Sequence, residues 1–292
     1  MKLNRALKRW PWLQKKDFAW KVRWRMRHDR NERFIMLQDK YLVKEFAASR
    51  GVRAAEVLYL TDQPSTTPFD RLPPRYFLKA NHGSCWNILH LESGFYLFGN
   101  GARLFAGGAS LPKDEASAAC RLTREQCIRQ CETWLGRKYS TKEWAYQHIS
   151  PKIVVEEFLE SADGPELRDY RCYTFDGVVK AMNVCSAPHR SRNENFFCDP
   201  DWKEFTLTKY KERRPATPME RPANLKELVA TAEKLGKGLD FVRIDLYHTT
   251  RGVMLGEMTL YPERGGEDTP TACPVFNQWL GDQWVLNRNG SG

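Results

Sequence analysis

The chain has 292 residues, of which 41% are hydrophobic and 28% are charged, and its net charge is +10. This composition is typical of a globular protein, and the length suits one large domain or two or three lobes that share a core. No apolar run reaches the ~18–20 residues of a membrane-spanning helix, and the N-terminus lacks the pattern of a secretion signal, so we expect a cytoplasmic protein.

The eight cysteines are spread along the chain, which argues against a small fold held together by disulfides. Cys120, Cys127 and Cys131 invite a zinc interpretation, but no CxxC pair or closing histidine lies near them. We therefore expect free, structural thiols.

The positive charge is concentrated in residues 1–33, which contain twelve basic and three acidic residues; the rest of the chain is nearly neutral. Apolar and basic residues alternate from Trp20 to Arg27 as in a strand, but Trp20 and Trp24 have helical spacing, and we favour a helix. A basic segment rich in aromatic residues suits an anionic membrane surface or an acidic polysaccharide. Alternatively, its aromatic residues pack on the body of the protein. No recognition motif for nucleic acid is present, so nucleic acid is not an expected partner.

The first elements of the body are a helix and two strands. The pattern predicts a helix over 39–51, with Asp39 as its cap and Gly51 at its end, and a strand over 52–61. A second strand begins at residue 75 and leads into a loop of small residues, 81–87, with Lys79 at the end of the strand. Backbone amides of such a loop can bind phosphate, although the Walker A motif is absent.

The remaining elements before residue 240 alternate between helix and strand. We expect an amphipathic helix over 114–136 with Thr123 as a cap, a strand over 153–159, and a hairpin over 168–184 that turns at Asp176-Gly177. A loop over 186–201 and a helix over 224–236 that Gly236 ends follow.

Two further strands, 241–247 and 253–259, form the most informative stretch. Alternate side chains of a strand share a face, so Arg243 lies with Asp245, and Glu257 lies with Thr259. Paired as a hairpin, they present one cation and two carboxylates at one place. Carboxylate oxygens suit Mg²⁺, and an arginine beside the metal stabilises anionic charge. The alternative is a surface hairpin with a salt bridge.

These pieces together resemble the ATP-grasp superfamily, most closely its TupA-like branch, from about Asp39 to Gly281. The resemblance is carried in order by three motifs: Asp39-Lys40, then Leu78-Lys79 with Asn81-His82-Gly83-Ser84, then Arg243-Ile-Asp245 with Gly256-Glu257-Met-Thr259. It implies an α+β ATP-grasp fold in which two α+β lobes clasp ATP, preceded by a basic, helical N-terminal extension. The implied domains are 1–38 for the extension, 39–75 for an N-terminal or central lobe, 76–160 for the small lobe with the phosphate-covering loop and hinge, and 161–292 for the large lobe with the metal site.

The resemblance also implies cofactors and site residues. ATP and Mg²⁺, with two ions expected, would be bound. The implied roles are nucleotide binding by Lys40, Lys79, Asn81, His82, Gly83, Ser84, Glu156, Glu157, Phe158, Leu159 and Glu166, metal binding by Asp245, Glu257 and Thr259, and catalysis by Arg243 and Lys79. Thr259 replaces the usual asparagine, and Cys85 stands where relatives often have glycine. Arg190 and Arg192 either bind substrate or belong to a solvated loop.

The implied reaction is ATP-dependent carboxylate–amine ligation through an acyl phosphate, with release of ADP. In the TupA-like branch it would join an amino acid or peptide to a uronic acid carboxylate during cell-surface polysaccharide biosynthesis, at the inner face of the membrane. One alternative is a phosphotransferase that acts on a glycan hydroxyl. Another is a non-catalytic nucleotide-binding adaptor at the membrane.

Overall fold

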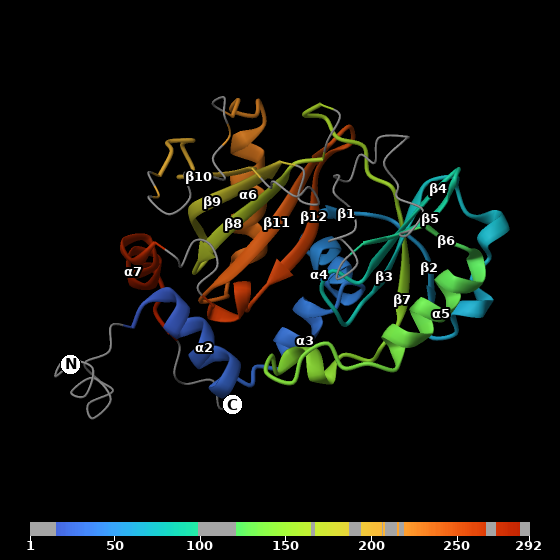
Figure 1. Ribbon diagram of the computed structural model, residues 1–292. Helices are drawn as coiled ribbons and strands as arrows, with labels where there is room; N and C mark the ends of the chain where they lie inside the picture. Colours follow the sequence, from blue (N-terminus) through green and yellow to red (C-terminus); the bar gives the residue numbers. More distant parts are fainter. Residues whose placement is uncertain are drawn as a thin grey trace.

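The computed structural model describes residues 16–98, 121–164, 167–186, 194–205, 207, 215, 219–266 and 273–286. Two six-stranded sheets form its frame, and helices α3 (Arg33–Gln38) and α4 (Leu42–Ser49) lie between them (Figure 1). No helix in these ranges is both long enough and apolar enough to cross a bilayer.

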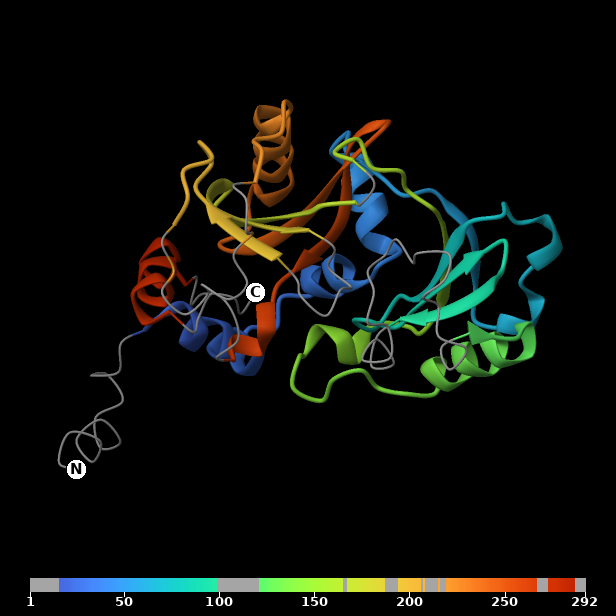
Figure 2. The ribbon, with the colours of Figure 1, turned by 45° about the horizontal axis from the view of Figure 1, so that its top comes forward.

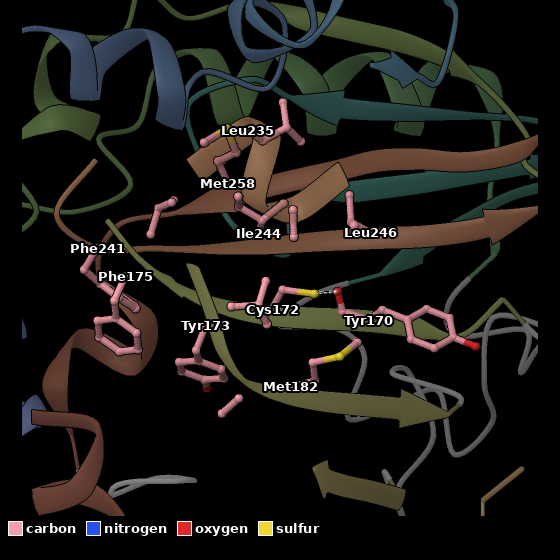
Figure 3. Packing of buried hydrophobic residues seen from close by; sticks show 14 of the residues in the cluster. Tyr170, Cys172, Tyr173, Phe175, Met182, Leu235, Phe241, Ile244, Leu246 and Met258 are labelled. Carbon is pink, nitrogen blue, oxygen red and sulfur yellow. Dashed lines mark hydrogen bonds between the residues drawn. The ribbon is translucent and has the colours of Figure 1, made fainter. Parts of the chain in front are cut away.

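The larger hydrophobic core lies on the sheet that contains the predicted metal hairpin. In spatial order its strands are β1 (Arg53–Ala54), β12 (Gly252–Thr259), β11 (Val242–Thr249), β8 (Asp169–Phe175), β9 (Val178–Ser186) and β10 (Glu194–Cys198). β1 runs parallel to β12, and the other neighbours are antiparallel. Helix α6 (Leu225–Gly236) covers one face, where Leu235, Ile244 and Met182 belong to one buried cluster (Figure 3).

Helices α2 (Phe18–His28) and α7 (Pro274–Gln283) cover one end of the opposite face (Figures 1 and 2). The ring of Phe18 lies 4.9 Å from that of Phe241 and 6.0 Å from that of Tyr173. Phe18, Val22 and Met26 are all buried at helical spacing, so the helical interpretation of this segment is confirmed. Phe18 therefore packs on the body of the protein. From α2 onward, the basic extension is part of the fold.

The smaller core lies on the second sheet, which is antiparallel throughout. Its strands, in spatial order, are β2 (Val57–Thr61), β7 (Ile153–Glu157), β3 (Tyr76–Ala80), β4 (Asn87–Leu91), β5 (Gly94–Phe98) and β6 (Arg121–Leu122). Helix α5 (Arg124–Leu135) contributes Cys127, Cys131 and Trp134 to this core. Thr123 caps it in a capping box with Gln126, as predicted, and the described cysteines are free thiols.

Short 3₁₀ turns complete the described part of the chain: η2 (Pro64–Thr66), η3 (Phe69–Arg71), η4 (Ala145–His148) and η6 (Pro262–Gly265). The predicted hairpin at Asp176-Gly177 is present, with both turn residues at positive φ. The predicted helix over 39–51 is shorter and begins at Leu42. Asp39 nevertheless accepts hydrogen bonds from the backbone of Tyr41 at 2.8 Å and Leu42 at 3.3 Å.

Three local predictions are wrong. The single strand over 52–61 is two strands, because β1 joins the large sheet and β2 the small one. The loop over 186–201 contains strand β10, which is held by pairing with β9 rather than by a pattern of its own. The helix over 114–136 is shorter, because Arg121–Leu122 form strand β6 and α5 begins only at Arg124. By contrast, α6 ends at Gly236 as predicted, and this glycine also lets the helix pack closely, since a Cβ there would lie 2.5 Å from Cγ2 of Thr174.

Candidate active site

Strands β11 and β12 bring the four predicted residues of the metal hairpin together. Their register places Arg243 opposite Thr259 and Asp245 opposite Glu257. Arg243 holds the Asp245 carboxylate with a two-pronged contact, from Nε to Oδ1 at 2.8 Å and from Nη2 to Oδ2 at 2.7 Å. Both side chains are buried. This planar pairing fixes the guanidinium in the plane of the carboxylate.

The same guanidinium reaches three more groups. Nη2 lies 3.4 Å from Glu257 Oε1 and 3.3 Å from Thr259 Oγ1, and Nη1 lies 3.3 Å from Glu263 Oε1. Thr259 Oγ1 in turn donates to Glu257 Oε1 at 3.3 Å. One arginine thus faces three carboxylates, so the cluster carries excess negative charge.

Because of this crowding, the pKa values of the facing carboxyl groups of Asp245 and Glu257 shift in opposite directions. Burial raises the pKa of Asp245 to about 8; Arg243 opposes this rise, and the carboxylates of Asp169 and Glu257 add to it. Burial also acts to raise the pKa of Glu257, but the cations of Lys40 and Arg243 lower it to about 2. Crowded carboxylates of this kind are relieved by an additional cation.

The donor chemistry of the hairpin fits Mg²⁺. Asp245 and Glu257 supply hard carboxylate oxygens, and Mg²⁺ usually binds through one or two carboxylates and completes its shell with phosphate oxygens and water. In the described ranges, no group of three or more His, Cys, Asp or Glu residues is arranged to hold a metal alone. A metal at this hairpin would therefore need ligands from a bound phosphate.

Two lysines surround one buried carboxylate of the small sheet: Lys79 lies on β3, Lys44 lies on helix α4, and the carboxylate belongs to Glu156 of β7. Lys79 Nζ donates to Glu156 Oε2 at 2.7 Å, and Lys44 Nζ lies 3.3 Å from Glu156 Oε1. The sequence predicted Lys79 and Glu156 for the nucleotide site but not Lys44. The sequence did contain a signal for Lys44, because this lysine lies four residues after Lys40, at the spacing of one helical turn.

The loop over 81–87 lies against Lys40, whose Nζ donates to the Gly83 carbonyl oxygen. Asn81 and His82 are internal supports: Asn81 Nδ2 donates to Asp39 Oδ2 at 2.9 Å, and the two nitrogens of His82 contact Asn81 Oδ1 and the Trp134 carbonyl. Burial lowers the pKa of His82. Contact of these two residues with a nucleotide stays a prediction.

Two residues of the same loop show why it has its shape. Gly83 approaches Trp86 so closely that a Cβ would lie 2.6 Å from the indole ring. Cys85 has φ 60°, a left-handed conformation that glycine adopts more easily. Ser84, also predicted to bind nucleotide, lies beside Cys85 with its hydroxyl 3.7 Å from the thiol sulfur.

The predicted adenine hinge, residues 156–159, comprises the last two residues of β7 and the two that follow it. Glu157 Oε1 accepts a hydrogen bond from the Glu56 backbone at 2.8 Å and lies 2.5 Å from Arg251 Nη2. The rings of Phe158 and Phe77 stack with their centroids 6.0 Å apart, and Leu159 is half-buried. Glu166, Arg190 and Arg192 lie outside the described residues.

Sequence comparisons identify the family. The family model described as TupA-like ATPgrasp matches residues 125–285, which is more than half of the chain. No match was found among curated proteins.

Several solved structures are similar in architecture. The D-alanine–D-alanine ligase of Bacillus anthracis complexed with ATP is 15% identical, with a TM-score of 0.46, over 85% of this chain and 63% of that chain. The enzyme of Helicobacter pylori is 13% identical, with a TM-score of 0.46, over 86% and 62%. The ATP-grasp ligase PsnB, complexed with minimal precursor, Mg and ADP, is 12% identical, with a TM-score of 0.43, over 86% and 60%. The chain spans less than two thirds of the length of each.

The family match covers the α5 helix, the hinge, the metal hairpin and α7. Together with the two-sheet α+β architecture, it confirms the expected ATP-grasp fold. This chain belongs to the TupA-like ATP-grasp family.

Proposed function

We propose that the protein is an ATP-dependent carboxylate–amine ligase that forms ADP. The observation that carries the proposal is the convergence of Arg243, Asp245, Glu257 and Thr259 on one face of the large sheet. A nucleotide-binding module without chemistry has no need of an arginine committed to the metal carboxylates. Membership in the TupA-like ATP-grasp family supports ATP as the phosphoryl donor.

In the proposed reaction, a substrate carboxylate attacks the γ-phosphate, which gives an acyl phosphate and ADP. An amine then attacks the acyl carbon, and phosphate leaves. Lys40 and Lys79 would neutralise the ATP phosphates, and the hinge over 156–159 would hold the adenine. The positions of the two lysines favour this role. Lys40 donates to the loop over 81–87, and Lys79 lies on β3, the strand that precedes this loop.

Asp245 and Glu257 would hold Mg²⁺, with Thr259 beside them; two ions are proposed. When bound, the metal supplies positive charge at the transferring phosphoryl group. Arg243 would stabilise the oxyanion that forms during amine attack and the acyl phosphate before it. The loop over 81–87 would exclude water, which hydrolyses an acyl phosphate.

For the substrates we propose an amino acid or peptide as the amine and a uronic acid as the carboxylate, in cell-surface polysaccharide biosynthesis. A peripheral position at the inner face of the membrane belongs to the same proposal. The support is the family and the excess of basic residues over 1–33, which suits an anionic surface or an acidic polysaccharide.

The test is ADP release by the purified full-length protein with Mg²⁺·ATP, uronic acids and amino acids, with hydroxylamine added to trap acyl phosphate as a hydroxamate. We expect Glu257→Gln to reduce turnover by at least about a hundredfold, because one metal carboxylate is removed. Glu227→Gln, on the exposed side of α6, is the matched control and should retain activity. Normal turnover in Glu257→Gln would refute the metal assignment. A stable phosphorylated hydroxyl product would replace the ligase with a kinase.

A further inference from the structure

A second polar cluster lies on the same face of the large sheet, one strand beyond Asp245. Strand pairing places Arg171 opposite Asp245 and Asn183 opposite Arg171. Glu257, on the other side of Asp245, completes one row across four neighbouring strands. Neighbouring strands are about 4.8 Å apart, so the row of metal carboxylates continues directly into a cation and an amide.

Arg171 is only half paired. Its Nε donates to Asp169 Oδ2 at 2.7 Å, whereas Nη1 and Nη2 make no hydrogen bond to any described residue. The side chain remains 22% exposed. Arg243, by contrast, contacts a partner with each of its three nitrogens. Because the edge of a guanidinium matches a planar carboxylate, Arg171 offers an anion-binding edge beside the metal site.

Two buried oxygens on this face lack hydrogen-bond donors. Asp169 is 6% exposed and Asn183 is 4% exposed, and Oδ1 of each has no partner in the described part of the chain. Asp169 lies two residues before Arg171 on β8 and therefore shares its face. A buried acceptor without a partner costs about 1–3 kcal/mol, so such a pair is expected where a ligand or water supplies the donor.

We propose that Arg171, Asp169 and Asn183 form the subsite for a substrate that carries a carboxylate next to an N–H or O–H donor. The carboxylate binds the free edge of Arg171, and the donor group satisfies Oδ1 of Asp169 and Asn183. This inference rests on the proposed function, because it places one substrate of the ligase beside the metal carboxylates.

The arrangement excludes simpler ligands. Sulfate satisfies Arg171 but has no donor for the two buried oxygens. Inorganic phosphate carries an O–H donor at neutral pH, but the Asp169 carboxylate repels its charge. A neutral sugar satisfies the oxygens but not the arginine. An α-amino acid and a sugar acid each carry both groups, so they share the chemistry that the subsite requires.

The experiment is calorimetric titration of the full-length protein, saturated with Mg²⁺ and a nonhydrolysable ATP analogue. The ligands are the proteinogenic amino acids, D-glucuronate and D-galacturonate. L-alaninamide and D-glucose lack the carboxylate, and propionate lacks the donor. We expect at least one acid to bind and the three truncated compounds not to bind. Binding by an amino acid identifies the amine substrate, and binding by a uronate identifies the carboxylate substrate.

Variants separate this role from a structural one. Arg171→Gln and Asn183→Leu should each weaken binding of the acid by at least about tenfold, and Arg171→Lys should not restore it, since lysine lacks the fork. Asn183→Leu should leave the affinity for the Mg²⁺–nucleotide complex within about twofold, because Asn183 lies two strands, or about 10 Å, from Asp245. Arg124→Gln, in an exposed ion pair with Asp70, is the matched control and should change neither affinity.

The outcomes distinguish this inference from the proposed function. If the nucleotide complex binds but no acid does, or if the acid binds Arg171→Gln as tightly as the unaltered protein, the subsite is wrong and the nucleotide site stands. If the Mg²⁺–nucleotide complex itself fails to bind the unaltered protein, both proposals are overturned.

Discussion

Glu156 is the residue that holds together Lys79 of β3 and Lys44 of α4. Its carboxylate contacts Lys79 and Lys44 and is 5% exposed. Burial acts to raise its pKa, but the two ammonium groups lower it to about 2 from an ordinary 4.5. Burial also lowers the pKa of Lys44. The contacts of one carboxylate with two ammonium groups compensate for the loss of water that these groups suffer on burial.

The depressed pKa of Glu156 predicts a pH dependence. A carboxyl group with a folded-state pKa of about 2 and an unfolded pKa of 4.5 stabilises the fold fully above pH 4.5. The stabilisation is lost as the pH falls from about 4.5 to about 2, and its full size is about 3 kcal/mol. Glu156→Gln should therefore lower the free energy of unfolding by about that amount at pH 7 and by progressively less toward pH 3. Urea unfolding of both proteins between pH 7 and pH 3 measures this. A difference that does not change with pH would contradict it.

Among the elements, η6 links the N-terminal helix to the active site. Glu263 and Arg264 have φ of 47° and 55°, which costs about 1–3 kcal/mol for each non-glycine residue. Helix α2 holds this turn, because Arg23 Nη1 donates to the Gly265 carbonyl. From the turn, Glu263 reaches Arg243, and Arg264 Nε donates to Glu143 Oε1 at 2.6 Å. The basic extension thus contributes to the position of the proposed catalytic arginine.

Helix α2 is anchored by a fully buried arginine. The guanidinium of Arg25 contacts Asp240 and donates from Nη1 to the Phe241 carbonyl at 2.8 Å. It also lies over the indole of Trp284, 4.4 Å from the ring centroid. Because the aromatic rings exclude water, this ion pair is part of the core rather than of the surface.

Arg25→Ala should lower the free energy of unfolding by about 3–5 kcal/mol, because Asp240 loses its charged partner and a cavity opens among the rings. Arg27→Ala, on the exposed side of the same helix, is the control and should change stability by no more than about 0.5 kcal/mol. Chemical denaturation measures both. An equally small effect at position 25 would mean that α2 is attached only peripherally.

At the scale of the whole molecule, the proposed nucleotide site spans both sheets. A direct contact links the two sheets, from Arg251 in the turn between β11 and β12 to Glu157 of β7. A second contact joins Arg264 of η6, which follows β12, to Glu143, which precedes η4 and β7. A nucleotide whose phosphates lie between the lysines and the metal carboxylates would add the strongest link. Its binding would therefore stabilise the two lobes as one unit.

This predicts that a nonhydrolysable ATP analogue raises the melting temperature only when Mg²⁺ is present, because without the metal the Glu257 carboxylate repels the phosphates. At one hundred times the dissociation constant, binding adds about 2.7 kcal/mol to stability. Thermal melting with each component alone, with both, and after EDTA gives the comparison. The absence of a shift at millimolar nucleotide would refute the proposed nucleotide site and direct attention to residues 1–33.

The membrane and polysaccharide partners proposed for residues 1–33 stay predictions. Within the described part of this segment, several cations serve the fold: Lys21 and Arg23 donate to backbone carbonyls, and Arg25 is buried. The domain boundaries also stay predictions. The short segment that contains β1 and β2 contributes to both sheets, which local composition gives no means of anticipating.

Local patterns in the sequence were sufficient for the elements whose side chains repeat with a fixed period. The period of two over 241–247 and 253–259 predicted that Arg243, Asp245, Glu257 and Thr259 share a face, and strand pairing confirms it. Capping at Thr123 and the Asp-Gly turn were also predicted, since each depends on the chemistry of a few adjacent residues.

The tertiary structure decided what depends on partners distant in the chain. β10 exists because β9 pairs with it, Lys44 is a site residue because Glu156 lies within its reach, and Arg25 is buried because rings from three other segments surround it. Likewise, the row from Glu257 through Asp245 and Arg171 to Asn183 is made by strand register alone. The sequence by itself determined the family, the fold and the shared face of Arg243, Asp245, Glu257 and Thr259, because these follow from local periodicity and motif order. Long-range pairing determined which other charges join them, because charge recognition depends on distance in space.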